Sequence, residues 1–130
     1  MIVFKNEGIL DINSIITFGV SVKEKESAIG FFGTGLKYAI AVLLRNGCEI
    51  AIKSGMDVYY FSTNELIVRG KSFPVITMNG TQLAFTTEYG KTWELWQAAR
   101  ELYSNCLDEG GVVTEEIDDS FQGTQVIVMG

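Results

Sequence analysis

The alternation of apolar and polar positions divides the chain into strand-like and helix-like segments. Residues 1–5 are mostly apolar and are followed by Asn-Glu-Gly, which predicts a short strand ending in a turn. Residues 11–18 carry apolar side chains at a spacing closer to that of a helix, so a short helix is expected there. The apolar run at residues 36–44, rich in Ala and Leu, predicts a longer helix that ends at Asn46-Gly47.

The middle of the chain predicts an antiparallel sheet. Segments with strand-like composition or alternation are residues 48–53, 58–62, 66–69, 75–78 and 82–87. Turns are expected at Ser54-Gly55, Thr63-Asn64 and Asn79-Gly80. Residues 124–129 predict one more strand. Strands joined by tight turns favour a sheet with one face covered by helices.

Residues 92–107 form the clearest amphipathic helix that the sequence predicts. Apolar side chains recur at helical spacing, Thr92 is a suitable N-cap residue, and the pair Gly110-Gly111 follows the last turn. We therefore expect this helix to pack one face on the sheet.

A line of polar side chains follows the same helix. Glu101, Asn105 and Asp108 are four and then three residues apart, so they lie nearly on one line. A carboxylate, an amide and a carboxylate in a row can position a water, hold a hard cation such as Mg²⁺ or accept a hydrogen bond from a base. The alternative is a solvated polar face. The apolar residues beside them argue against that alternative.

Three glycines, Gly30, Gly33 and Gly35, precede the helix expected at residues 36–44. Glycine lets a ligand approach the main chain, and a helix N-terminus offers unpaired N–H groups and a positive dipole, which together favour an anion site. Their spacing matches neither the Walker loop nor the dinucleotide fingerprint. The alternative is a turn that only caps a core helix. The charged residues 24–27 ahead of it fit a lid over a ligand or an ordinary surface loop.

Composition narrows the possible functions. The 130 residues suit one domain, and the net charge of −6 argues against general binding to nucleic acid or anionic membranes. The chain has no histidine, which excludes Ser-His-Asp and Cys-His catalysis and histidine-bound metals. Cys48 and Cys106 are expected to be buried free thiols. No apolar run is long enough to cross a membrane and residues 1–6 do not resemble a leader, so a cytoplasmic location is expected.

Residues 100–110 resemble the N-box of the GHKL ATPases, the family of DNA gyrase, heat-shock chaperone, histidine kinase and MutL proteins with the Bergerat nucleotide fold. The family pattern, Glu, three residues, Asn, two residues and Asp, is met in full. Residues 29–37 are similar to the family's glycine box and residues 18–23 to the start of its lid. Asn6-Glu7-Gly8 stands where the adenine-reading Asp-x-Gly turn is expected, and Gly80-Thr81 resembles the final Gly-Thr box.

This resemblance implies an α+β fold, a two-layer α/β sandwich with a mostly antiparallel sheet and helices on one face. It implies that Mg-ATP is bound, with ATP or ADP as the ligand. By the same resemblance Glu101 would orient the attacking water, Asn105 would hold Mg²⁺, and Asp108 and Asn6 would contact adenine or its waters. The other nucleotide contacts that it implies are Gly8, Lys23, Gly30, Gly33, Thr34, Gly35, Leu36, Lys37 and Thr81.

The order of the boxes differs from that of the family, because the N-box lies near the end of the chain. Circular permutation accounts for this order. Residues 124–129 would then be the strand after the N-box helix and residues 1–5 the next strand, with the chain opened at the hairpin between them. We therefore predict that the two chain ends pair antiparallel in one sheet. Asn6 stands in place of the family's Asp, and Leu10 in place of its second glycine.

The expected function is Mg-ATP binding with slow hydrolysis, coupled to a conformational change or to a protein partner. A homodimer is one such arrangement, since many family members couple ATP to dimer closure. The alternative is a non-catalytic module that binds a nucleotide or a protein and acts as a regulator or inhibitor. A third alternative is a relative that has lost its ligand. Neither nucleic acid nor a membrane is expected as a partner.

Overall fold

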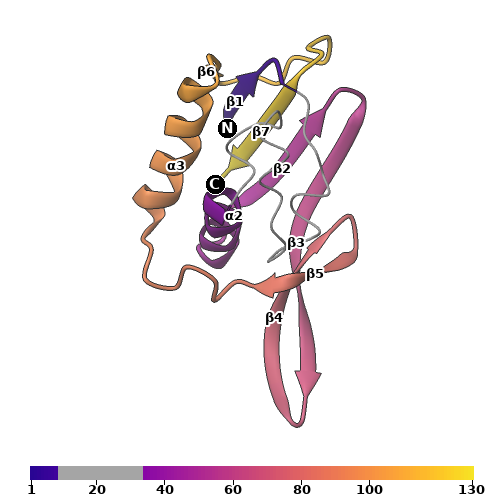
Figure 1. Ribbon diagram of the computed structural model, residues 1–130. Coiled ribbons are helices and arrows are strands. Elements are labelled where there is room, and N and C mark those ends of the chain that lie inside the picture. Colours follow the sequence, from indigo (N-terminus) through magenta and orange to yellow (C-terminus); the bar gives the residue numbers. More distant parts are fainter. Residues whose placement is uncertain (9–33) are drawn as a thin grey trace, which may run out of the picture.

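A computed structural model describes residues 1–8 and 34–130, and these residues form an α+β fold around one antiparallel sheet (Figure 1). The strands are β1 (Ile2–Asn6), β2 (Glu49–Ser54), β3 (Asp57–Val68), β4 (Lys71–Met78), β5 (Thr81–Thr86), β6 (Val112–Thr114) and β7 (Thr124–Met129). The helices are α2 (Thr34–Arg45) and α3 (Leu95–Asp108). The order across the sheet is β5-β4-β3-β2-β7-β1-β6. The expected α+β class and mostly antiparallel sheet are thus confirmed.

The two chain ends lie next to each other in the sheet, as expected. Strands β1 and β7 pair antiparallel, with Ile2 opposite Val128 and Asn6 opposite Thr124. On its other side β1 pairs with β6, where Val3 lies opposite Thr114. The strand that directly follows α3 is therefore β6, and the expectation that residues 124–129 would follow the polar helix directly was wrong. Strand β6 has only three residues, too few to show a clear alternation.

The structure has one long strand where the sequence predicted two. Thr63 and Asn64 lie within β3, and Asn64 is opposite Val75 of β4, so the expected turn there is absent. The chain reverses instead at Arg69 and Gly70, both with positive φ. Pairing with β4 on both sides of residues 63–64 outweighs their local turn preference. Because β2 pairs with β3 only as far as Phe61, the far ends of β3 and β4 project from the sheet as a two-stranded arm (Figure 1).

Both helices of the described residues match segments expected to be helical. Helix α2 carries the apolar run, whereas the helix expected at residues 11–18 lies outside the described residues. Helix α3 begins at Leu95, later than expected from Thr92. Its N-cap is Glu94, whose N–H donates to Oε1 of Gln97 at 2.7 Å, so a side chain of the first turn fixes the start. Neither helix is long and apolar enough to span a membrane.

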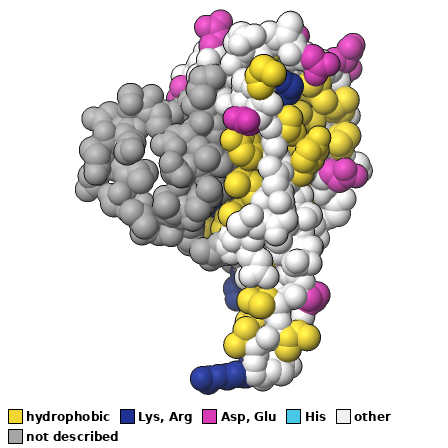
Figure 2. All heavy atoms as spheres, turned by 90° about the vertical axis from the view of Figure 1, so that its right-hand side faces the viewer, with side chains coloured by type: hydrophobic (Ala, Val, Ile, Leu, Met, Phe, Trp, Pro, Cys, Tyr) yellow, Lys and Arg dark blue, Asp and Glu magenta, His cyan; other side chains and the backbone are white. Residues whose placement is uncertain are grey.

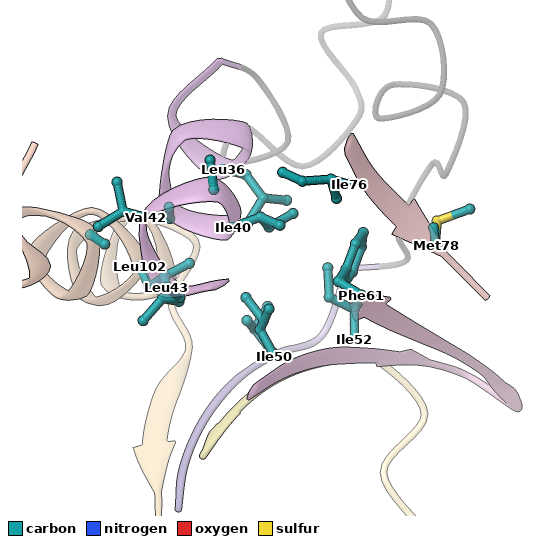
Figure 3. Packing of buried hydrophobic residues seen from close by; sticks show 14 of the residues in the cluster. Leu36, Ile40, Val42, Leu43, Ile50, Ile52, Phe61, Ile76, Met78 and Leu102 are labelled. Atoms are coloured by element: carbon teal, nitrogen blue, oxygen red, sulfur yellow. The ribbon is translucent and has the colours of Figure 1, made fainter. Parts of the chain in front are cut away.

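One buried hydrophobic cluster joins residues of both helices to residues of the sheet (Figure 3). Alternate strand residues, including Phe4, Ile50, Ile52 and Val126, belong to the same buried cluster as the helix residues. From α2 it includes Leu36, Ala39, Ile40, Ala41, Val42 and Leu43. Leu102 and Cys106 extend it along α3, and Cys106 is a buried free thiol as expected. Cys48 is also free but only partly buried.

Candidate functional site

Helices α2 and α3 lie side by side in opposite directions. At the C-terminal end of α2, Arg45 donates to the carbonyl oxygens of Thr87 at 2.6 Å and Trp93 at 3.1 Å, just before α3 begins. At the other end, a Cβ added to Gly35 would lie 2.6 Å from the carboxyl carbon of Glu101. The first turn of α2 therefore meets the middle of α3 at its polar line, and only glycine fits there without displacing Glu101.

Glu101 and Asn105 form a fixed pair at this meeting point. The Nδ2 of Asn105 donates to Oε2 of Glu101 at 2.6 Å. Such a short, charge-assisted bond restrains both side chains. Since the amide nitrogen is bonded to Glu101, the amide oxygen of Asn105 is the atom left to meet a hard cation.

Lys37 lies one turn into α2 but on a different side of the helix from Gly35. Two residues along an α-helix are separated by roughly 200° around its axis, so Lys37 points away from α3. Its side chain is buried, at 6% exposure, and this burial lowers the pKa of its ammonium group. Leu36, between them, is fully buried in the core, so its side chain packs and does not face a ligand.

A buried polar row crosses one end of the sheet on its helix-facing side. Asn6, Thr124 and Ser54 are opposite one another on β1, β7 and β2, and they are 3%, 0% and 7% exposed. They share the face of the core residues two positions away in each strand, since side chains alternate along a strand. The Oγ1 of Thr124 donates to the carbonyl oxygen of Gly8 at 2.7 Å and lies 3.3 Å from Oγ of Ser54. The inner face of the sheet thus changes from apolar to polar at this end.

Asn6 carries a buried hydrogen-bond donor in this row. Its Oδ1 accepts a hydrogen bond from the backbone N–H of Gly8 at 3.2 Å. Its Nδ2 has no hydrogen-bond partner within residues 1–8 and 34–130. An unsatisfied buried donor is destabilising, so such a group in a folded protein calls for an explanation.

The polar row and the polar line of α3 lie at the same end of the molecule. The Sγ of Cys106, in the last turn of α3, is 3.4 Å from the carbonyl oxygen of Lys5, the residue before Asn6. Helix α2 directs its N-terminus toward this end, because Arg45 in its last turn bonds the carbonyl oxygen of Trp93, just before α3 begins. Asp108 is exposed at the end of α3. The structure therefore places Gly35, Glu101, Asn105, Asp108 and Asn6 in one region of the fold.

Some residues that the sequence proposed for the site are not in this region. Thr81 is exposed at the start of β5, the strand at the edge of the sheet farthest from β1 and β6. Gly30, Gly33 and Lys23 lie outside the described residues. Thr34 opens α2, and its side chain is not among those described.

The residues that sequence reasoning missed are Thr124 and Ser54. A signal for Thr124 was present, because Gly123-Thr124 directly precedes a strand just as Gly80-Thr81 does. A Cβ at Gly123 would overlap the backbone of Asn6 and Glu7, so the glycine permits close contact with the β1 turn. Nothing local in the sequence marks Ser54, which joins the row through strand pairing alone.

The described part of the chain contains no group of three or more Asp, Glu or Cys side chains that could hold a metal ion. A bound Mg²⁺ would be held by the amide oxygen of Asn105 together with ligand phosphates and water. Mg²⁺ commonly binds in this way in phosphate-transfer sites. Burial raises the pKa of the Cys106 thiol, which therefore stays protonated and structural.

Three comparisons with known proteins found no match. No family model, curated protein or solved structure matches the chain.

Proposed function

We propose that this protein binds a magnesium nucleoside triphosphate and hydrolyses it slowly, in the manner of the GHKL ATPases, on a two-layer α/β sandwich with circularly permuted connections. ATP is the nucleotide that the resemblance implies. One observation carries the proposal: Gly35, at the start of α2, abuts Glu101 in the polar line of α3. A phosphate-binding turn and a water-positioning carboxylate have to be neighbours for this chemistry.

The first turn of α2 suits the phosphates. Its N–H groups have no partners within the helix, and the helix dipole adds positive potential. Because Gly35 has no side chain, the carboxylate of Glu101 can lie against this turn. In a chain of net charge −6, phosphate charge has to be neutralised locally, by these groups and by the cation. Bound Mg²⁺ would supply that positive charge and polarise the terminal phosphate.

The carboxylate of Glu101 is the group that would act on water. It accepts from Nδ2 of Asn105, which holds it toward the N-terminus of α2. A carboxylate fixed there can orient a water for attack on the terminal phosphate and accept its proton. The buried polar row of Asn6, Thr124 and Ser54 would face the other end of the nucleotide, together with Asp108. Phosphoryl transfer requires such positioning and no covalent intermediate on the protein.

The permuted connection is supported by strand pairing. Strand β1 lies between β6 and β7 and pairs antiparallel with both. In the family's order a strand following the N-box helix leads directly to the strand that carries the base-reading turn. Here the strand that pairs with β1 at the other chain end is β7, so joining the two ends would make β7 and β1 a hairpin, with β1 carrying that turn. The short strand β6 is an addition between α3 and β7. Opening the chain between β7 and β1 would account for the order of the boxes.

A second candidate function, a regulatory protein-binding module, is favoured by the arm formed by β3 and β4. Figure 2 shows apolar side chains exposed along this arm and a basic side chain at its tip. The exposed apolar residues are Leu66, Ile67, Val68 and Phe73, with Ile67 71% exposed. Arg69 lies in the turn of the arm and Lys71 directly follows the turn. These features suit an apolar surface with an acidic rim on a protein partner.

Titration calorimetry with Mg-ATP, followed by phosphate release in the wild type and in Glu101→Ala, tests the proposal. Binding in both proteins, with turnover only in the wild type, supports a hydrolase. Binding without wild-type turnover supports the regulatory module. The absence of Mg-ATP binding would refute ATP as the nucleotide. Glu65→Ala, an exposed carboxylate of the arm, is the matched control and should behave as the wild type.

A further inference from the structure

We infer that the base of the bound nucleotide presents a carbonyl oxygen to Asn6, so that the site prefers a 6-oxopurine, guanine or hypoxanthine, over adenine. This inference rests on the proposed function, since it specifies the base of the nucleotide proposed above. The observation behind it is the buried Nδ2 of Asn6, which lacks a hydrogen-bond partner among the residues that the structure describes.

The orientation of the Asn6 amide is fixed by its neighbour. A backbone N–H can donate a hydrogen bond but cannot accept one. The side-chain atom 3.2 Å from the Gly8 nitrogen must therefore be the amide oxygen. The amide NH₂ consequently faces away from Gly8. Rotating the amide by 180° would place two donors against each other, so the free function of Asn6 is a donor.

Thr124, the neighbouring side chain in the polar row, does not accept a hydrogen bond from Nδ2 of Asn6. Thr124, directly opposite Asn6, donates its hydroxyl proton to the carbonyl oxygen of Gly8 at 2.7 Å. At 3% exposure Asn6 is also nearly sealed from bulk water. A buried donor with no acceptor is costly, and a ligand that supplies the acceptor recovers that loss on binding.

Asn6 offers the base a hydrogen-bond donor, whereas an aspartate at the same position would offer an acceptor. An aspartate here could accept from Gly8 with one oxygen and would present its other oxygen, an acceptor, to the base. That acceptor suits the exocyclic amine of adenine. Asn6 presents an amine in the same place, which would meet the adenine amine donor to donor. A 6-oxopurine places an acceptor oxygen at that ring position and pairs with Nδ2.

Competition binding with ATP, ITP and GTP in the presence of Mg²⁺ tests the inference. ITP differs from ATP at position 6 and in the N1 proton that accompanies it, and GTP adds a 2-amino group to ITP. We expect wild-type protein to bind both ITP and GTP at least about tenfold more tightly than ATP, equivalent to about 1.4 kcal/mol. Asn6→Asp, measured at pH 8 so that the new carboxyl is ionised, should reverse the preference. Asn64→Asp makes the same change on the exposed arm and should leave the preference unchanged.

The outcomes separate the base assignment from the nucleotide proposal. Wild-type protein that binds ATP as tightly as ITP, or more tightly, overturns the base assignment and leaves nucleotide binding intact. Wild-type protein that binds none of the three refutes nucleotide binding itself, and the base assignment with it. If Asn6→Asp does not fold, as judged by circular dichroism, the wild-type ratio of ITP to ATP affinity decides alone.

Discussion

Gly35→Ala should leave the stability of the fold nearly unchanged and strongly reduce nucleotide hydrolysis. The new methyl group would lie 2.6 Å from the carboxyl carbon and 3.2 Å from Cγ of Glu101, too close for both to stay. Helix α2 cannot move away from Glu101, because Leu36 and Ile40 are fully buried in the core. The end of the Glu101 side chain is flexible and must move instead, away from its 2.6 Å bond with Asn105.

Two opposing effects keep the stability nearly unchanged. Losing one partly exposed hydrogen bond lowers the free energy of unfolding by about 1 kcal/mol. Replacing glycine by alanine in a helix raises it by about 0.5–1 kcal/mol. We therefore expect a melting temperature within about 4 °C of the wild type. Activity should change far more, because misplacing a catalytic group by about 1 Å reduces the rate by about 100-fold.

The measurements are thermal unfolding by circular dichroism, calorimetry with Mg-ATP, and single-turnover phosphate release. The same Gly35→Ala change in a Glu101→Ala background is the control. With the carboxylate gone, the methyl group has nothing to displace, so the second substitution should add no further loss of turnover. A folded Gly35→Ala protein that hydrolyses nucleotide at the wild-type rate would contradict this reasoning, as would a stability loss above about 3 kcal/mol.

Three further predictions concern other parts of the fold. Because burial lowers the pKa of Lys37 from its ordinary 10.5, the folded protein binds fewer protons than the unfolded chain as pH approaches 10.5. Its contribution to stability therefore rises with pH in that range, and urea unfolding of Lys37→Met should lack this rise. Gly123→Ala would force a methyl group against the backbone of Asn6 and should lower the free energy of unfolding by about 2 kcal/mol in the same assay. Joining the paired chain ends by a short linker and opening the chain at the tip of the β3–β4 arm should leave the circular dichroism spectrum unchanged, and a loss of folding would count against permutation.

Much of the secondary structure followed from local sequence. The apolar run of α2, the alternation in β2 and the composition of β7 each predicted the right element, because these segments bury one side against a common core. The misses occurred where pairing overrides local preference. Thr63-Asn64 has the composition of a turn but continues a strand, since β4 pairs on both sides of it. Strand β6 is too short to be recognised, and it exists because β1 offers it a partner.

The candidate site also has one part that the sequence predicts and one part that only the tertiary structure shows. Sequence alone determined the line of Glu101, Asn105 and Asp108, because helical spacing places those side chains on one line wherever the helix lies. Only the tertiary structure decided that Gly35 meets Glu101, since helix packing sets which turns of two helices touch.

The row of Asn6, Thr124 and Ser54 was likewise decided by the tertiary structure. Its members come from three strands that are distant in the chain, and the register of pairing, which no short stretch encodes, brings them into line. Sequence determined which chemical groups the chain carries, and packing decided which of them face one another.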